Sequence, residues 1–162
     1  MDSNSFSFEI RKLSSHFYSD YSRDSYPEIL EKELRPYTCL LIETNYGYYI
    51  CIPFRTDISH KYSYHFKSTS RSVHHRSGLD YSKMVLVSDT DYFSKESTLI
   101  DRDEYVETQK NIQKIYTHAV AYLNEYVKFV NGNSSLSPEE LRRRYQFSTL
   151  KYFHDILHLP KL

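Results

Sequence analysis

The sequence predicts an α+β fold in a single domain. Short stretches with alternating or β-branched apolar residues fill the first half of the chain, whereas apolar residues recur at three- and four-residue steps in the second half. Strands followed by helices favour an α+β arrangement over alternating βαβ units. The length of 162 residues fits one domain, and no repeat or low-complexity linker divides residues 1–162.

The first elements are short. Residues 5–11 alternate between polar and apolar side chains, which predicts a strand with one buried face. Two helical turns are expected between residues 14 and 33. Ser14 and Asp24 are their candidate caps, and Pro27 suits a first helical position.

A central hairpin comes next. Pro36 opens a strand over residues 37–44, Asn45-Tyr46-Gly47 is typical of a hairpin turn, and residues 48–54 form the returning strand. Both strands are apolar on both faces, so we expect them at the centre of the sheet. Pro53 has no N–H to donate, and it is therefore expected at the edge or end of its strand.

The remaining strands and the longest helix follow. Residues 84–88 predict a strand and residues 97–100 a weaker one. Asp101 and Glu104 form a capping pair that begins the longest helix. The apolar stripe of this helix consists of Ile112, Ile115, Tyr116, Ala119, Leu123, Tyr126, Val127 and Val130.

The C-terminal part is predicted to be helical. Asn131-Gly132 ends the long helix, since glycine readily takes a left-handed conformation. Ser137-Pro138-Glu139-Glu140 combines a cap, a first-position proline and a third-position carboxylate, and so predicts another helix. A last helical stretch is expected over residues 149–157.

The composition bears on location. Apolar runs such as Val85-Leu86-Val87 fall far short of the roughly 20 residues needed to span a bilayer. Residues 1–5 lack the basic and apolar regions of a signal peptide, so we expect a cytoplasmic protein without a membrane partner. In a reducing cytoplasm, Cys39 and Cys51 are interpreted as small buried side chains, with a disulfide as the alternative.

Charge is segregated along the chain. Its 21 basic and 21 acidic residues balance, yet residues 55–83 hold six basic and two acidic residues, a net charge of +4, and the rest carries −4. Cations interleaved with aromatic rings suit a nucleic-acid strand, because cations meet phosphates and rings stack on bases. A solvated polar loop is the alternative. The candidate RNA contacts here are Tyr62, Lys67, Arg71, His74, His75, Arg76 and Lys83.

The segment that follows the returning strand combines groups able to cleave RNA. A ribose 2′-hydroxyl can attack the adjacent phosphorus, so a protein needs only to move two protons and stabilise phosphoryl charge. The alternative is a loop whose polar side chains only face solvent. In the catalytic interpretation His60 moves a proton, Lys61 or Arg55 stabilises charge, and the Thr56 and Ser59 hydroxyls hold the phosphate.

Several of these stretches occur together in a known family. Arg35-Pro36-Tyr37, the apolar hairpin and residues 52–62 resemble the toxin of type III toxin–antitoxin systems, the ToxN/AbiQ-like endoribonucleases, in their CptN-like branch. Residues 77–83, followed by a strand, and Asp103-Glu104-Tyr105 at a helix start also fit that branch. The resemblance covers residues 35–126.

The resemblance implies a strongly bent antiparallel sheet of SH3-like, partly barrel character with helices around it. It also implies metal-independent cleavage of mRNA, leaving a 2′,3′-cyclic phosphate and a 5′-hydroxyl. The same activity would process a repetitive antitoxin RNA, whose pseudoknot inhibits the toxin in a closed protein–RNA assembly, and would serve phage defence by abortive infection.

The family's functional positions can be carried over to this sequence. Its strand-end hydroxyl pair and lysine fall around Arg55, Thr56 and Ser59-His60-Lys61, and Arg35 and Tyr37 are second-rank RNA contacts. Many members have two hydroxyl residues where this chain has Arg55-Thr56, which leaves open which cation replaces the usual lysine.

No cofactor, metal or DNA partner is expected. Adjacent histidines such as His74 and His75 point in different directions, and no carboxylate or cysteine set completes a metal site with them. A non-catalytic RNA-binding protein that uses residues 55–83 is the main alternative function. An interaction protein that self-associates through its segregated charge is a third.

Overall fold

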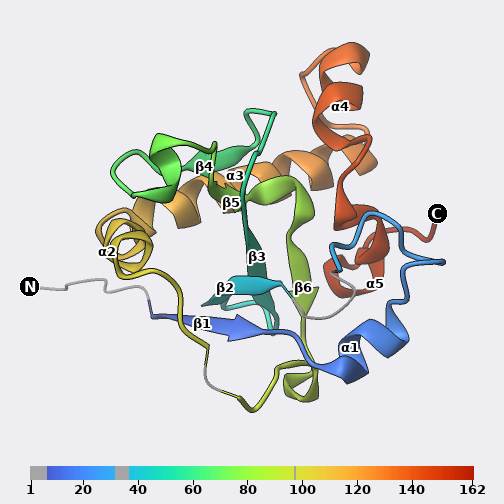
Figure 1. The fold of residues 1–162 in the computed structure, drawn as a ribbon. Helices are drawn as coiled ribbons and strands as arrows, with labels where there is room; N and C mark the ends of the chain where they lie inside the picture. The colour runs from blue at the N-terminus through green and yellow to red at the C-terminus, as the bar shows by residue number, and fades with distance from the viewer. Residues whose placement is uncertain (1–6, 32–36, 97) are drawn as a thin grey trace, which may run out of the picture.

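The computed structural model describes residues 7–31, 37–96 and 98–162, and its fold is α+β as the sequence predicts (Figure 1). Six strands form one antiparallel sheet with the path β1-β2-β3-β5-β4, and β6 pairs with β3 beside this path. The sheet is not closed into a barrel. The strands are β1 (Phe8–Lys12), β2 (Thr38–Glu43), β3 (Tyr49–Arg55), β4 (Ser63–His65), β5 (Gly78–Asp80) and β6 (Val85–Val87).

Strand β3 is the centre of the sheet because it has three partners. It pairs with β2 on one side, and with β6 through residues 49–51 and β5 through residues 54–55. Pro53 lies inside β3, opposite Cys39, so the expectation that it marks an edge or end is wrong. Pro53 falls between the residues of β3 that pair with β6 and those that pair with β5. A residue without an N–H is tolerated at such a position.

The short strand β5 lies between β3 and β4 and brings Asp80 close to the end of β3. Gly78 pairs with Arg55 on β3 and with His65 on β4. A Cβ atom at Gly78 would lie 1.9 Å from the carbonyl oxygen of Tyr64, so only glycine allows this close approach. Asp80 therefore lies two residues after Gly78, the residue that pairs with Arg55.

The expectation of two helical turns in the N-terminal part is half right. Ser14 caps α1 (Ser15–Asp20), its hydroxyl accepting from the Phe17 N–H at 3.3 Å. Residues 22–30 form isolated turns, such as the one closed by Tyr26 N–H and Ser22 O at 2.8 Å, so Asp24 caps no helix there. Packing of the Tyr26 ring against Tyr21 and Tyr152 holds this stretch instead.

The long helix is interrupted at Asn111, which separates α2 from α3. The Asn111 side chain donates to the Glu107 carbonyl oxygen at 2.8 Å, a local bond that competes with the helical pattern. Asp101 lies at the N-cap of α2, but its side chain makes no capping bond. The α-helices are α1 (Ser15–Asp20), α2 (Arg102–Lys110), α3 (Ile112–Val130), α4 (Pro138–Tyr145) and α5 (His154–Leu157).

Short 3₁₀ turns and irregular connections complete the chain. Residues 98–100 form no strand, and Leu99 is 93% exposed, so the weaker strand predicted there is wrong; residue 97 lies outside the described residues. The final helical stretch is confirmed as a 3₁₀ turn followed by α5. The 3₁₀ turns are η1 (Arg71–Val73), η2 (Tyr81–Lys83), η3 (Thr90–Tyr92) and η4 (Thr149–Tyr152).

The core is a single cluster of buried residues to which the sheet, α3 and several shorter elements contribute. Both faces of β2 and β3 are largely buried, and α3 contributes a buried stripe. Cys39 and Cys51 are buried free thiols, and burial raises the pKa of Cys39 to about 12, so it stays neutral. The buried residues of α3 are Ile115, Ala119, Tyr122, Leu123 and Tyr126.

Two predicted helix ends are confirmed. Gly132 follows α3 with φ of +74°, and the Ser137 hydroxyl accepts from the Glu140 N–H at 3.2 Å to cap α4. Within the described ranges, none of the helices combines the length and the apolar character that crossing a bilayer requires.

Candidate functional site

Asp80, at the end of β5, is the centre of a polar cluster where β3 ends. Its side chain is 0% exposed, and its carboxylate accepts a hydrogen bond from Arg55 Nη1 at 2.6 Å. The backbone N–H and hydroxyl of Ser82 donate to Asp80 Oδ1 at 3.0 and 2.6 Å. His60 Nε2 lies 3.2 Å from Asp80 Oδ2. One buried carboxylate thus holds a guanidinium and an imidazole side by side.

These contacts keep Asp80 ionised. Burial raises the pKa of the Asp80 carboxyl, but the hydrogen bonds from His60, Ser82 and Arg55 outweigh burial and leave this pKa below its ordinary value. A buried carboxylate destabilises the fold unless it is paired, so Asp80 needs these three partners to be tolerated at this position.

The hydrogen bonds of His60 assign its tautomer. Nδ1 accepts the backbone N–H of Tyr62 at 3.1 Å, so the proton of a neutral ring is on Nε2, which faces Asp80 and lies 3.3 Å from Ser82 Oγ. Both ring nitrogens therefore have partners. Any other hydrogen bond from the ring would require His60 to give up one of these partners.

The loop between β3 and β4 presents the other predicted catalytic residues. Thr56 and Ser59 are exposed, and between them Ile58 is buried and donates its N–H to the Arg76 carbonyl oxygen at 2.9 Å. Asp57 has φ of +57°, uncommon for a residue with a side chain. Ile58 therefore anchors a loop whose hydroxyls remain open to solvent.

Helix α4 closes one side of this loop. Lys61 is 74% exposed, with Nζ 4.0 Å from Glu140, and the Tyr62 hydroxyl donates to Glu140 at 3.4 Å. Two cations lie near the Tyr62 ring, since Lys61 Nζ is 5.7 Å and Arg144 Cζ 5.4 Å from its centre. It also stacks on His60 with ring centres 5.9 Å apart. Tyr62 is thus an aromatic platform beside the Asp80 cluster.

Lys83, predicted as an RNA contact, belongs to the same electrostatic neighbourhood. Its Nζ donates to the Phe147 carbonyl oxygen at 2.7 Å. Burial lowers the pKa of Lys83; the nearby Asp80 carboxylate opposes this shift and the Arg55 guanidinium adds to it. The cluster therefore includes a second cation besides Arg55.

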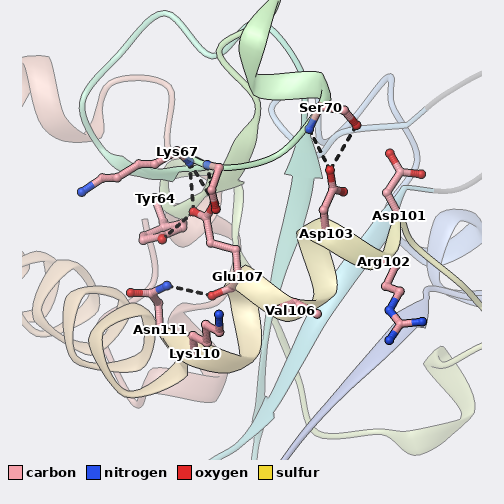
Figure 2. Close-up of a pocket in the computed structure, with 11 residues that line it drawn as sticks. Tyr64, Lys67, Ser70, Asp101, Arg102, Asp103, Val106, Glu107, Lys110 and Asn111 are labelled. Carbon is pink, nitrogen blue, oxygen red and sulfur yellow. Dashed lines mark hydrogen bonds between the residues drawn. The ribbon is translucent and has the colours of Figure 1, made fainter.

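The rest of the basic segment is docked on α2 beside a pocket of about 820 Å³ (Figure 2). The buried Glu107 carboxylate accepts from the backbone N–H groups of Lys67 and Ser68 at 3.0 and 2.8 Å and from the Tyr64 hydroxyl at 2.7 Å. Burial raises the pKa of Glu107, but these bonds outweigh it and leave the pKa below the ordinary value. Asp103 accepts from the Ser70 N–H at 2.7 Å.

This pocket is separate from the predicted catalytic residues, none of which lines it. Figure 2 shows the Lys67 side chain pointing away from Glu107, which it contacts through its backbone. Arg71 donates to Asp101 at 3.1 Å, and His75 lies 2.9 Å from Asp57. Among the residues that the structure describes, Lys67 therefore has no carboxylate partner for its ammonium group, whereas Arg71 and His75 have one.

The remaining predicted RNA contacts differ in exposure. His74 and Arg76 are exposed beside the Thr56–Ser59 loop, to which Arg76 is tied through its carbonyl oxygen. Tyr37 is half-buried before β2, and the β2–β3 register carries it to the same end of the sheet as Arg55. Arg35 lies outside the described residues.

Sequence reasoning missed the roles of Asp80 and Ser82. Both lie in the 77–83 stretch that supported the family resemblance, and Asp80 is one of only two acids among six cations in residues 55–83. That isolation was the available signal for a carboxylate that pairs with these cations. Among the residues that the structure describes, no group of three or more His, Cys, Asp or Glu is placed to hold a metal ion.

Compared with family models, with curated protein sequences and with solved structures, the chain shows no significant match to any of them.

Proposed function

We propose that this protein is a metal-independent endoribonuclease and the toxin of a type III toxin–antitoxin system. The observation that carries the proposal is the end of β3, where buried Asp80 fixes Arg55 and His60 next to a solvent-exposed loop bearing Thr56, Ser59 and Lys61. Charged and hydroxyl groups held on a rigid strand end are suited to positioning a phosphate.

The proposed reaction uses the substrate's own nucleophile. A ribose 2′-hydroxyl loses its proton to a base, and its oxygen forms a bond to the adjacent phosphorus. The bond between phosphorus and the 5′-oxygen breaks, and that oxygen takes up a proton. The products are a 2′,3′-cyclic phosphate and a 5′-hydroxyl, with no water consumed in this step.

The residues at the end of β3 have different roles in the proposed reaction. Arg55 has five N–H donors, and its bond to Asp80 leaves others for phosphoryl oxygens. Exposed Lys61 adds a mobile cation, and the Thr56 and Ser59 hydroxyls donate to the same phosphate. His60 exchanges a proton when it gives up one of its two contacts. Each charge-stabilising donor contributes about 10²–10³ in rate.

The proposed partners are RNAs. Substrate mRNA and a pseudoknot antitoxin RNA would occupy the same surface, and the antitoxin would inhibit the enzyme in a closed protein–RNA assembly in the bacterial cytoplasm. The exposed cations of residues 55–83 and the resemblance of residues 35–126 support this proposal. Release of the enzyme during phage infection would then arrest the infected cell.

A second candidate is an RNA-binding protein without catalysis. It is favoured by one observation, that Asp80 and the Tyr62 N–H already engage Arg55 and both nitrogens of His60. In that case the cluster only braces the loop, and the exposed cations only hold RNA.

Analysis of RNA ends separates the two functions. Purified protein in EDTA should cut single-stranded RNA and leave cyclic-phosphate and 5′-hydroxyl ends. Thr56→Ala and Lys61→Ala should each slow cleavage by about 10²-fold with RNA affinity nearly unchanged. Lys114→Ala, which removes an exposed lysine of α3, is the matched control and should cut normally.

Intact RNA after incubation with wild-type protein, or variants that lose binding and activity in parallel, would favour the RNA-binding alternative. Activity lost in EDTA and restored by a divalent cation would contradict the metal-independent mechanism.

A further inference from the structure

A second site, on the other side of α4, has the composition of a nucleobase pocket. It has a volume of about 570 Å³ and lies between the C-terminal end of α3 and α4. Its walls include the rings of Tyr126, Phe129 and Tyr145, whose centres lie 5.2 to 6.2 Å apart. None of the residues proposed for cleavage lines it.

The polar atoms of the two tyrosines are already satisfied inside the protein. The Tyr145 hydroxyl donates to the Tyr122 carbonyl oxygen at 2.8 Å, and the Tyr126 hydroxyl lies 2.7 Å from His154 Nε2. Ring carbon is therefore what these side chains contribute to the pocket. Phe129, 39% exposed, adds a third ring at the solvent side. Such walls favour a flat apolar ligand.

Arg142 supplies the pocket with an uncompensated positive charge. Of the three consecutive arginines of α4, Arg143 lies 3.7 Å from Glu139 and Arg144 lies 3.3 Å from Glu140. Arg142, which lines the pocket, is paired with no carboxylate within the described ranges. The other lining cation, Lys151, is neutralised by Glu28 at 2.7 Å. A free guanidinium beside aromatic walls fits a ligand that is flat at one end and anionic at the other.

Helix α4 links this pocket to the candidate catalytic surface. Glu140 and Arg144 contact Tyr62, whereas Leu141, Arg142 and Tyr145 line the pocket. An RNA strand bound beside Tyr62 would therefore reach the other side of the same short helix. Gln146, at the end of α4, adds an amide that can pair with a base edge.

We infer that this pocket binds one unstacked nucleobase, with Arg142 on its adjoining phosphate. RNA is the expected source, and in that respect the inference rests on the proposed function. Proteins commonly hold single-stranded RNA through such a combination of ring stacking and a phosphate contact.

The test measures binding separately from cleavage. The probe is a short single-stranded RNA with 2′-fluoro groups, which lacks the attacking hydroxyl, and its affinity is measured by fluorescence anisotropy. Arg142→Gln should weaken binding about tenfold, whereas Arg143→Gln, which removes the same charge from the same helix, should change it less than about twofold.

Phe129→Ala should weaken binding about tenfold, since one base stack is commonly worth that much. Phe129→Leu keeps apolar bulk without a flat ring, so it should also weaken binding while retaining the wild-type melting temperature. A photoreactive 4-thiouridine in the probe should cross-link to the peptide that contains Phe129 or Tyr145.

Three further arms decide the result. A probe made abasic throughout should lose the difference between wild type and Phe129→Ala. AMP binding that Arg142→Gln weakens supports the same chemistry with a free nucleotide as its source. Equal losses for Arg142→Gln and Arg143→Gln, or a changed oligomeric state in light scattering with RNA affinity unaltered, would overturn the inference.

Wild-type protein that cuts RNA while all four variants bind normally refutes only the pocket, whereas wild-type protein that neither binds nor cuts RNA refutes the proposed function.

Discussion

Asp80 and Glu107 are two buried carboxylates that hold different kinds of partner. Asp80 holds mainly side chains, those of Arg55, His60 and Ser82, together with the Ser82 N–H, at the end of β3. Glu107 holds the loop after β4 through the N–H groups of Lys67 and Ser68, and it also accepts from the hydroxyls of Tyr64 and Ser68. Both carboxylates have a native pKa below the ordinary value, although burial opposes this in each case.

Under the proposed function, this difference distinguishes a carboxylate of the reaction site from one that supports a loop. A backbone N–H bound to a carboxylate stays where the fold puts it, so Glu107 fixes the shape of a loop. Arg55 and His60 are partly exposed side chains, which under the proposed function would exchange contacts when a phosphate binds. Burial and satisfied hydrogen bonds are common to both carboxylates, so they do not by themselves distinguish the two roles.

The largest effect is expected from Asp80→Asn. Removing the charge leaves Arg55 without its buried partner and frees His60, so we expect cleavage to fall at least about 10²-fold. Breaking a buried ion pair also costs about 3 kcal/mol of unfolding free energy. Single-turnover cleavage and urea unfolding measure the two effects. If this variant does not fold, His60→Asn tests the same cluster, and wild-type cleavage in either variant would remove the cluster from the mechanism.

Glu107→Gln should separate stability from activity. An amide oxygen accepts hydrogen bonds less strongly than a carboxylate, so the unfolding free energy should fall by about 1–3 kcal/mol. Cleavage per folded molecule should stay within about twofold, because the substituted group contacts a loop and no predicted catalytic residue. A loss of activity as large as that of Asp80→Asn would erase the distinction between the two carboxylates.

Stability should depend on acid pH through both groups. Each carboxyl has a lower pKa in the native than in the unfolded state, so the unfolded chain binds more protons as pH falls. The stabilisation is therefore complete above the unfolded pKa, about 4, and is lost as pH decreases below it toward the native pKa. Urea unfolding at several pH values should show this slope, and Asp80→Asn should reduce it. A slope unchanged in the variant would place the titration elsewhere.

The smallest expected effect is on the salt dependence of RNA affinity, and it compares a cation without a carboxylate partner in the described residues with one that has such a partner. Exposed Arg76 should contribute a phosphate contact, so Arg76→Ala should reduce the salt dependence of RNA affinity by about 0.7 in log–log slope. Arg71 pairs with Asp101 at 3.1 Å, and Arg71→Ala should reduce the slope less. Anisotropy titrations across salt concentrations measure both. Equal reductions would show that the ion pair does not compete with RNA.

Local signals predicted many of the elements correctly. The turn before β3 has Gly47 at φ of +85°, and Ser14 and Ser137 cap their helices as expected. These features depend on residues within one turn of one another, and so a single sequence is sufficient to reveal them. The same local reasoning failed at Asp24 and at residues 98–100, where packing and irregular chain replace the expected helix and strand.

The sequence by itself determined the strand-first order, the central hairpin, the apolar stripe of α3 and the concentration of positive charge in residues 55–83. Only the tertiary structure decided which of those cations are free, and that Asp80 organises the end of β3. The reason is that Arg55 and Asp80 are 25 residues apart, and Ser68 and Glu107 are 39 apart. Hydrogen bonds over such separations form only after strands pair and helices pack, so no local pattern records them.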